Sequence, residues 1–176
     1  MAAQHLDPAS LTRWGNPRPD GDLHCRGTAV ALNGQGVLII GPSGSGKSGL
    51  ALSLMALGAV LIADDGVTVG AGHDGLNLHR PATAPALIEA RGIGLLHAGP
   101  VADQAPLALA IDLGTPPSVR IPPALAVGWA GQTAPLIHAK GVANVAVAVV
   151  IYLRHGPADA ERLSWAVPPD QQVRRP

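Results

Sequence analysis

"GPSGSGKS", residues 41 to 48, is the stretch from which the fold follows. It matches the pattern G-x-x-x-x-G-K-[ST] in full, after an apolar run typical of a β-strand and before spacing typical of an α-helix. Glycines there let backbone N–H groups turn toward phosphate oxygens, and the helix dipole adds attraction. The sequence therefore predicts a phosphate-binding loop in an α/β domain. The residues expected to contact phosphate are Gly41, Pro42, Ser43, Gly44, Ser45, Gly46, Lys47 and Ser48.

Two side chains of this loop have separate expected tasks. Lys47 is expected to reach the β and γ phosphates of a nucleoside triphosphate, and Ser48 to bind Mg²⁺. The loop does not identify what receives the phosphate. A guanine-reading N-K-x-D sequence is missing, and too little chain remains for the strand-helix arrays of a motor ATPase. A kinase or a small hydrolase remains.

The composition limits the class of protein. With 176 residues and 47% hydrophobic content, the chain is expected to bury one core. A formal net charge of zero argues against nucleic acid as a partner. The single cysteine, Cys25, excludes an internal disulfide framework and favours a cytoplasmic location. The apolar stretch 49–63 is short for a membrane span of about 20 residues, so no membrane contact is expected.

The chain divides into a central domain and two ends. Residues 1–22 and 157–176 are rich in proline and charge, so both are expected to be flexible tails around a domain at 23–156. Within the domain, 27–41 reads as two strands joined by an Asn-Gly turn. Two helices are predicted, one from Ser45 to Leu57 that Gly58 ends and one at 144–155. Strands are predicted at 59–65 and 107–114, with short β-like pieces at 66–70, 75–79, 86–92 and 93–99. The segment bracketed by Pro116 and Pro123 is expected to be irregular.

Two adjacent aspartates end the predicted strand 59–65. Successive side chains of a strand point to opposite faces, so Asp64 and Asp65 are expected to do different jobs. A phosphotransferase needs a proton acceptor beside the incoming hydroxyl, while the second acid would support metal or strand-end hydrogen bonds. Asp65 could instead begin a turn into Gly66. Asp112 also ends an apolar run, and a strand-ending role is favoured for it over metal binding.

The stretch "LIEARGIG", residues 87 to 94, holds a carboxylate and a guanidinium two positions apart. If the segment is extended, Glu89 and Arg91 share a face. Glu89 would then serve Mg²⁺ and Arg91 phosphate oxygens, and a surface ion pair is the alternative.

Residues 23–65, followed by "LIEARGIGLL" at 87–96, resemble the catalytic domain of the HPr kinase/phosphorylase family, in the short form that lacks the family's N-terminal domain. The resemblance runs from about Leu23 to about Leu113. It implies a P-loop NTPase-like kinase domain with a central mixed β-sheet, of the type also found in PEP carboxykinase. It further implies ATP-dependent phosphorylation of a serine on the phosphocarrier protein HPr, often with reverse phosphorolysis, by rings that are commonly hexamers.

The resemblance also assigns roles to individual positions. Asp64, the first aspartate of "ADD", matches the family's proton acceptor in phosphorylation and its donor in reversal. The other matching positions are Lys47 for phosphate, Ser48 and Glu89 for magnesium, His24 ahead of the strand pair, and Arg120 as a catalytic arginine.

Some positions depart from the family pattern. Cys25 and Arg26 follow His24, where a small residue is usual. Cys25 and His24 are not expected to form a nucleophile pair, because neighbours on a strand point apart. Ala143 stands where the family's basic glycine loop has an arginine, which counts against the reverse reaction.

Two other functions fit the same loop. A small-molecule kinase is disfavoured because an Arg-rich lid is not visible and the loop follows a leading hairpin. A regulatory module that senses ATP without transferring phosphate is disfavoured because a sensor needs no proton acceptor such as Asp64.

Overall fold

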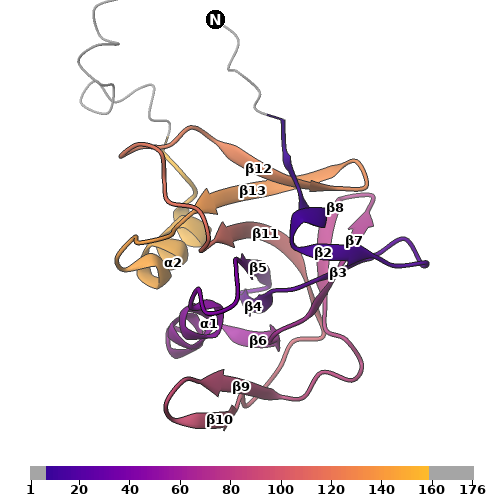
Figure 1. Cartoon of the computed structure of the whole chain (residues 1–176), viewed down its shortest axis with the longest axis vertical. Helices are drawn as coiled ribbons and strands as arrows, with labels where there is room; N and C mark the ends of the chain where they lie inside the picture. Colours follow the sequence, from indigo (N-terminus) through magenta and orange to yellow (C-terminus); the bar gives the residue numbers. More distant parts are fainter. Residues whose placement is uncertain (1–6, 159–176) are drawn as a thin grey trace, which may run out of the picture.

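The computed structural model describes residues 7–158. Within them the chain forms a curled mixed sheet of eleven strands, a separate two-stranded sheet and two α-helices (Figure 1). The elements are β1 (Ala9–Ser10), the 3-10 turn η1 (Leu11–Arg13), β2 (Gly15–Pro17), β3 (Leu23–Cys25), β4 (Thr28–Leu32), β5 (Gln35–Ile40), α1 (Lys47–Ala56), β6 (Val60–Ala63), β7 (Val67–Gly72), β8 (Gly75–His79), β9 (Leu87–Ala90), β10 (Gly94–His97), β11 (Gln104–Asp112), β12 (Leu125–Trp129), β13 (Gln132–His138) and α2 (Val145–His155).

Strand β5 lies at the centre, between β4 on one side and β11 on the other. It pairs antiparallel with β4 through the predicted Asn-Gly turn, in which Asn33 and Gly34 have φ of 50° and 78°. Positive φ at both positions matches a type I′ turn, whose twist suits a hairpin. The predicted hairpin is therefore confirmed, and its second strand leads directly into the phosphate loop.

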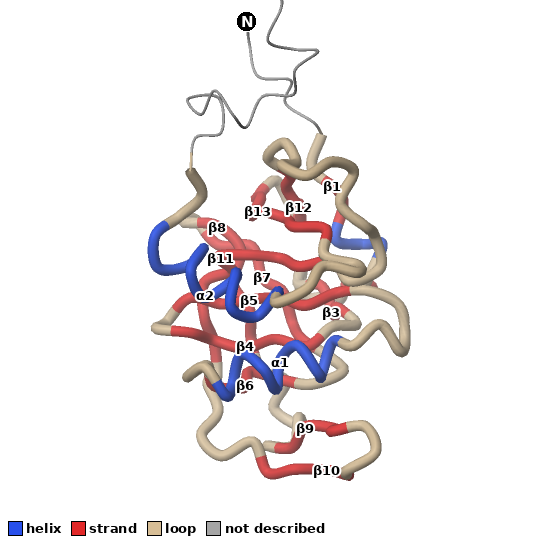
Figure 2. The backbone as a smooth tube through the Cα atoms, turned by 90° about the vertical axis from the view of Figure 1, so that its left-hand side faces the viewer, coloured by secondary structure: helices blue, strands red, loops and turns tan. Residues whose placement is uncertain are grey.

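The central strands are buried on both faces. Val37 and Ile39 of β5 pack in a cluster that includes residues of α1 and α2, because alternate side chains of a strand share a face. Leu38 and Ile40 pack in the other cluster, with residues of β3, β7 and β8. Helices α1 and α2 cover the first face (Figure 1, Figure 2), so the sheet separates two apolar layers.

Strand β11 joins the two limbs of the sheet. Its first residues pair antiparallel with β8, and its last residues pair in parallel with β5 and β13. From β8 the second limb continues through β7 and β3 to β2 and curls over the face away from the helices. Because β3 belongs to this limb, His24 is carried over the carboxyl end of β5, where the phosphate loop starts.

The segment 7–22 is not the flexible tail that its composition predicts. β1 pairs with β12, β2 pairs with β3, and Leu11 between them is 0% exposed. These strands have two or three residues, too few to show any periodicity in the sequence. The predicted C-terminal tail lies outside the described residues from 159 onward.

The strand at 59–65 and both helices are confirmed with slightly different ends. β6 stops at Ala63, before the two aspartates, and α1 runs from Lys47 to Ala56. After α1, the amides of Gly58 and Ala59 donate to the carbonyls of Met55 and Leu54, a Schellman ending with Gly58 at φ 102°. Gly58 therefore ends α1, as the sequence predicted.

Strands β12 and β13 have no counterpart among the predicted elements. They form a hairpin whose turn uses Ala130 and Gly131, with φ of 47° and 79°. Alanine seldom adopts positive φ, so "WAGQ" lacks the Asn-Gly or Asp-Gly signal that identifies such a turn. The hairpin continues the sheet beyond β11.

Strands β9 and β10 form a hairpin apart from the main sheet, beneath α1 and β6 in Figure 2. Ile88 of β9 is 1% exposed and belongs to the same apolar cluster as Leu54 of α1. All four residues of β10 are exposed. The hairpin is therefore attached to the rest of the domain through β9, which packs on the side of α1.

Neither of the helices found between residues 7 and 158 has the length and apolar content needed to cross a bilayer.

Candidate functional site

The phosphate loop connects β5 to α1 through three glycines with positive φ. Gly41, Gly44 and Gly46 have φ of 142°, 79° and 95°. Side-chain-bearing residues rarely adopt these values, so the loop needs glycine at these positions. Gly46 is also the N-cap of α1 and supplies no side chain to its free N–H groups. The helix therefore begins with its amides available to an outside acceptor.

The loop has unpaired polar groups that fit an anion. Among the recorded hydrogen bonds of residues 7–158, the amides of Ser43, Gly44 and Gly46 have no protein acceptor. The Ser45 hydroxyl is buried without a partner in the same part of the chain. Lys47 Nζ donates to the carbonyls of Gly41 at 3.2 Å and Pro42 at 3.1 Å, so its ammonium lies along the loop. Buried polar groups normally have a partner, and a phosphate would supply it.

Asp64 lies where three segments of the chain meet. Its carboxylate accepts hydrogen bonds from Thr28 Oγ1 at 2.7 Å, Ser48 Oγ at 2.9 Å and the Glu89 amide at 3.2 Å. These donors come from β4, the start of α1 and the β9 hairpin. Asp64 therefore connects Ser48, the serine predicted to bind magnesium, with the β9–β10 hairpin.

Asp65 points to a different part of the site. Because β6 ends at Ala63 and Asp65 has positive φ, a strand through both acids is wrong, and the alternative of a turn at Asp65 is confirmed. Asp65 instead has φ of 60° and lines a cavity together with His24 and Lys47. Asp64 and Asp65 therefore do lie in different surroundings, as expected. The turn at Asp65 separates them, and not the alternation of side chains along a strand.

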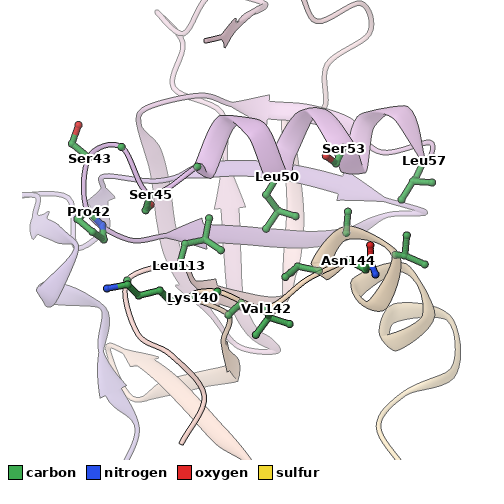
Figure 3. A pocket seen from close by; sticks show the side chains of 18 of the residues that line it. Pro42, Ser43, Ser45, Leu50, Ser53, Leu57, Leu113, Lys140, Val142 and Asn144 are labelled. Carbon is green, nitrogen blue, oxygen red and sulfur yellow. The ribbon is translucent and has the colours of Figure 1, made fainter. Parts of the chain in front are cut away.

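A first cavity of about 900 Å³ lies on the helix side of the loop, between α1 and the segment leading into α2. Figure 3 shows Leu50, Leu57 and Leu113 in it, with Val142 and Asn144 on the α2 side. The loop residues from Pro42 to Gly46 form its third wall. Its lining is mostly aliphatic apart from Lys140, and together with the free loop amides it suits the flat, uncharged part of a nucleotide.

A second cavity of about 840 Å³ opens on the other side of the loop. It is more polar, and its charged lining residues are Arg13, Arg26, Lys47 and Asp65. His24 lies at its inner edge, with a Cβ built on Gly66 falling 3.0 Å from the imidazole Cε1. The remaining lining residues are Thr12, Trp14, Gly15, Asn16, Gly41, Pro42 and Ser43. The predicted position of His24 near the phosphate loop therefore agrees with the geometry.

Other predicted site residues are not brought together. Arg120 is exposed in the irregular segment between β11 and β12 and lines neither cavity. Glu89 reaches Asp64 through its amide, not its carboxylate, and Arg91 lies exposed in the hairpin turn. The ion pair considered for Glu89 and Arg91 is not recorded in the described range.

The predicted metal ligands are Ser48, Glu89 and Asp65, and the carboxylate that contacts the Ser48 hydroxyl is that of Asp64, at 2.9 Å. Within residues 7–158, no group of three or more His, Cys, Asp or Glu side chains could hold a metal ion. The Ser48 hydroxyl and nearby carboxylates are nevertheless hard oxygen donors that fit Mg²⁺, which commonly takes one or two protein ligands plus phosphate oxygens. The residues present therefore suit magnesium bound together with a nucleotide.

Asp112 has the strand-ending role that was favoured for it. Its buried carboxylate accepts from the Gly114 amide at 2.7 Å and from Thr115 Oγ1 at 2.6 Å. A Cβ on Gly114 would lie 2.8 Å from Pro42 Cδ, so this turn supports the phosphate loop from behind.

Cys25 is 0% exposed and separated in orientation from its neighbour His24, as expected. Burial raises the pKa of its thiol to about 12, and the positive charge of Lys47 opposes part of that rise. A thiol with this pKa is not a nucleophile near neutral pH.

Thr28, Arg13 and Arg26 belong to the site but were not singled out in the sequence as site residues. Thr28 meets Asp64 because β4 pairs with β6, which brings Ala29 opposite Ala63. Arg13 meets the loop because β2 pairs with β3. These contacts depend on the register in which distant strands pair, and the sequence of one segment does not reveal that register.

Comparison with known proteins gives a consistent assignment. The family model described as "HPr Serine kinase C-terminal domain" matches residues 21–112. An HPr kinase/phosphorylase from Bordetella pertussis is 40% identical over 96 residues, which are 54% of this chain and 30% of that protein. One from Mycoplasmopsis pulmonis is 46% identical over 74 residues, 42% of this chain and 24% of that protein. One from Cupriavidus necator is 45% identical over 87 residues, 49% and 26% of the respective chains.

The matched parts are less than a third of each relative's length. Among solved structures, the HPr(Ser) kinase/phosphatase from Coxiella burnetii superposes with a TM-score of 0.64 at 24% identity, covering 74% of this chain and 88% of that one. The structural similarity supports the fold.

Proposed function

Because the chain belongs to the HPr serine kinase C-terminal domain family, we propose that it transfers the γ-phosphoryl group of ATP to a serine of an HPr-type phosphocarrier protein. The observation that carries this proposal is the meeting of Ser48, at the end of the phosphate loop, with the Asp64 carboxylate at 2.9 Å. A phosphate loop alone would serve a hydrolase or a sensor. An acid beside the loop serine also suits the metal site of a hydrolase, so family membership is what favours transfer to a hydroxyl, with Asp64 as the proton acceptor that such transfer requires.

The fold proposed for this activity is a P-loop kinase domain of the PEP carboxykinase-like type, covering residues 23–156. The N-terminal strands β1 and β2 extend its sheet. We place the nucleoside in the first cavity, because most of its lining is aliphatic, and the acceptor in the second, because that cavity holds Lys47, His24 and Asp65. Asp64, the proposed proton acceptor, lines neither cavity and is the chain neighbour of Asp65. The phosphate loop then lies between donor and acceptor.

The chain's own groups divide the work of transfer. The loop amides and Lys47 bind the phosphate oxygens and stabilise the charge that gathers on them in the transition state. Bound through Ser48 and Glu89, Mg²⁺ would neutralise charge between the β and γ phosphates. His24, which lines the second cavity, would donate a hydrogen bond to the transferred group. Arg91 and Arg120 are both exposed and line neither cavity, so the roles predicted for them, for Arg120 from the family resemblance, stay predictions.

The reacting atoms balance simply. The serine oxygen forms a bond to the γ phosphorus, the bond from that phosphorus to the bridging oxygen breaks, and ADP leaves. The serine proton passes to the Asp64 carboxylate. Because the transition state is loose, the acceptor needs correct placement more than strong basicity, and Thr28 and the Glu89 amide hold Asp64 in place.

The direct test is transfer of labelled γ phosphate from Mg-ATP to a purified HPr-type protein. We expect Asp64→Asn to lower kcat by about 10²- to 10⁴-fold, the usual contribution of a positioned proton acceptor. Asp65→Asn is the comparison variant, because it removes the neighbouring carboxylate, which lines the second cavity, and its kcat is expected to fall less than that of Asp64→Asn. If Asp65→Asn were the inactive variant, the proton acceptor would be Asp65. If the native chain bound ATP without transferring phosphate, a sensor or another acceptor would replace the proposal.

The same assay, run with inorganic phosphate and the phosphorylated acceptor, measures the reverse reaction. Ala143 lies between Val142 and Asn144 on the edge of the first cavity, where the family pattern has an arginine. We therefore propose that reversal to pyrophosphate is slow relative to the forward reaction. Ring assembly, commonly hexameric, and a cytoplasmic location are part of the proposal by family membership, and light scattering measures the former.

A further inference from the structure

The second cavity has a wall that the family match does not cover. The match begins at residue 21, whereas η1 and β2 supply Thr12, Arg13, Trp14 and Asn16 to the lining. Arg26, on the facing segment, is one of the departures from the family pattern. The family match therefore says nothing of residues 12–16 of this wall, and their role rests on their own contacts and charges.

The wall is held in place by backbone contacts. The Arg26 amide donates to the Trp14 carbonyl at 2.7 Å, and Leu11 is fully buried below it. Gly15 lies so close to β3 that a Cβ would fall 2.4 Å from the His24 carbonyl oxygen. The segments carrying Arg13 and Arg26 are thus fixed against each other, although both side chains are exposed.

The cavity is cationic in a chain that is neutral as a whole. Its charged lining residues are three cations, Arg13, Arg26 and Lys47, and one acid, Asp65, while the chain has 12 basic and 12 acidic residues. Neither arginine has a recorded side-chain hydrogen bond or ion pair to any residue of 7–158; Arg13 lies over the Trp14 ring at 5.2 Å. Guanidinium groups collected in a concave surface attract anions, and their planar donors match carboxylate geometry.

We propose that Arg13 and Arg26 bind acidic side chains of the acceptor protein next to its reacting serine, and so position that serine at the phosphate loop. This inference rests on the proposed function, because it assumes that the second cavity receives the acceptor. The nucleotide does not need these arginines, since Lys47 and the loop amides face its phosphates. A protein segment with carboxylates beside the serine complements the positive charge of the cavity.

The test measures steady-state phosphoryl transfer with the full chain and a purified HPr-type protein, varying acceptor and ATP separately. Arg13→Gln and Arg26→Gln are each expected to raise the KM for the acceptor about three- to tenfold, with kcat at saturating acceptor and the KM for ATP unchanged. Arg18→Gln is the matched control, because Arg18 is on the same segment, pairs with Asp20 at 3.2 Å and lies outside the cavity lining. Its kinetics are expected to be native.

Two further measurements separate a charge effect from a structural one. The native KM for the acceptor should rise with salt, and the double Arg13→Gln/Arg26→Gln variant should lose most of that dependence, because screening weakens only charge interactions. Arg13→Lys/Arg26→Lys should restore most of the acceptor affinity. A merely structural role would lower the thermal unfolding temperature and would not be rescued by charge.

Each of the other outcomes contradicts the inference for a different reason. An unchanged acceptor KM in the double glutamine variant refutes it while leaving the proposed function intact. A rise in the KM for ATP instead would assign the arginines to the nucleotide. If inorganic phosphate at constant ionic strength competes with the acceptor through these arginines, the bound anion is free phosphate and not an acceptor carboxylate. Absence of transfer by the native chain overturns the proposed function itself, and this inference with it.

Discussion

The hydrogen bond from Thr28 to Asp64 offers a quantitative test of how the site is built. Thr28 is 0% exposed, and its hydroxyl donates to the Asp64 carboxylate at 2.7 Å. Thr28→Val keeps the shape of the side chain and removes the donor. A hydrogen bond to a charged group contributes about 1.5–3 kcal/mol, so we expect a loss of about 2 kcal/mol in the free energy of unfolding.

The same substitution should cost less when the carboxylate is absent. In Asp64→Asn the acceptor is neutral, and a neutral hydrogen bond is about half as strong. Thr28→Val is therefore expected to cost about 1 kcal/mol in that background, giving a coupling of about 1 kcal/mol between the two positions. Thr28→Ser is the matched control: it keeps the hydroxyl and loses a methyl group, so its cost of about 1 kcal/mol should be the same in both backgrounds.

Urea unfolding measures these differences. For a domain of this size the slope is about 2 kcal/mol per M, so Thr28→Val should lower the midpoint by about 1 M in the native background and about 0.5 M in Asp64→Asn. Equal shifts in the two backgrounds would refute the reasoning, because they would mean that Thr28 stabilises the chain without its contact to Asp64. A larger shift for Thr28→Ser than for Thr28→Val would show that packing and not hydrogen bonding dominates at this position.

Three further outcomes are expected. Lys47→Ala should abolish detectable ATP binding by calorimetry and leave the thermal unfolding temperature nearly unchanged, because its ammonium contacts only the loop carbonyls of Gly41 and Pro42; a large drop in that temperature would contradict this. Gly15→Ala should weaken acceptor binding and destabilise the chain by about 1–3 kcal/mol, since its Cβ would fall 2.4 Å from the His24 carbonyl oxygen, and native stability in urea would show that β2 moves freely. Cys25 should not react with a thiol reagent at pH 8 until the chain unfolds. Because burial raises its pKa from 9.0 to about 12, the neutral thiol contributes stability that is full below pH 9 and lost as the pH rises through about 12, and a midpoint in urea that does not fall over this range would contradict it.

The local elements around the phosphate loop were predictable because their signals are local. Asn33 and Gly34 accept the positive φ of a tight turn, and Gly58 ends α1 for the same reason. The loop itself is identified by glycine spacing and by Lys47. Conformational preferences of single residues, and the period of apolar side chains, act over a few positions and can therefore be read along the chain.

Contacts between distant segments could not be predicted in this way. The sequence left two possibilities open for Asp64 and Asp65, a strand through both acids or a turn at Asp65, and the structure has the turn. The meeting of Asp64 with Thr28 depends on the register of β4 against β6. A shift of one residue would turn every side chain of such a strand to its other face, and apolar burial on both faces leaves little pattern to reveal the register.

The sequence by itself predicted the phosphate loop, and it determined the helix that follows the loop, the hairpin that leads into it and the likeness to a kinase family. The tertiary structure decided which residues surround that loop. It placed the N-terminal segment in the sheet, because burying Leu11 and pairing β2 with β3 offset the ordering of a segment that has no periodicity of its own. Two arginines that look like ordinary surface charges in the sequence thereby face the cavity beside Lys47, because backbone pairing, which carries no side-chain pattern, brings their segments together.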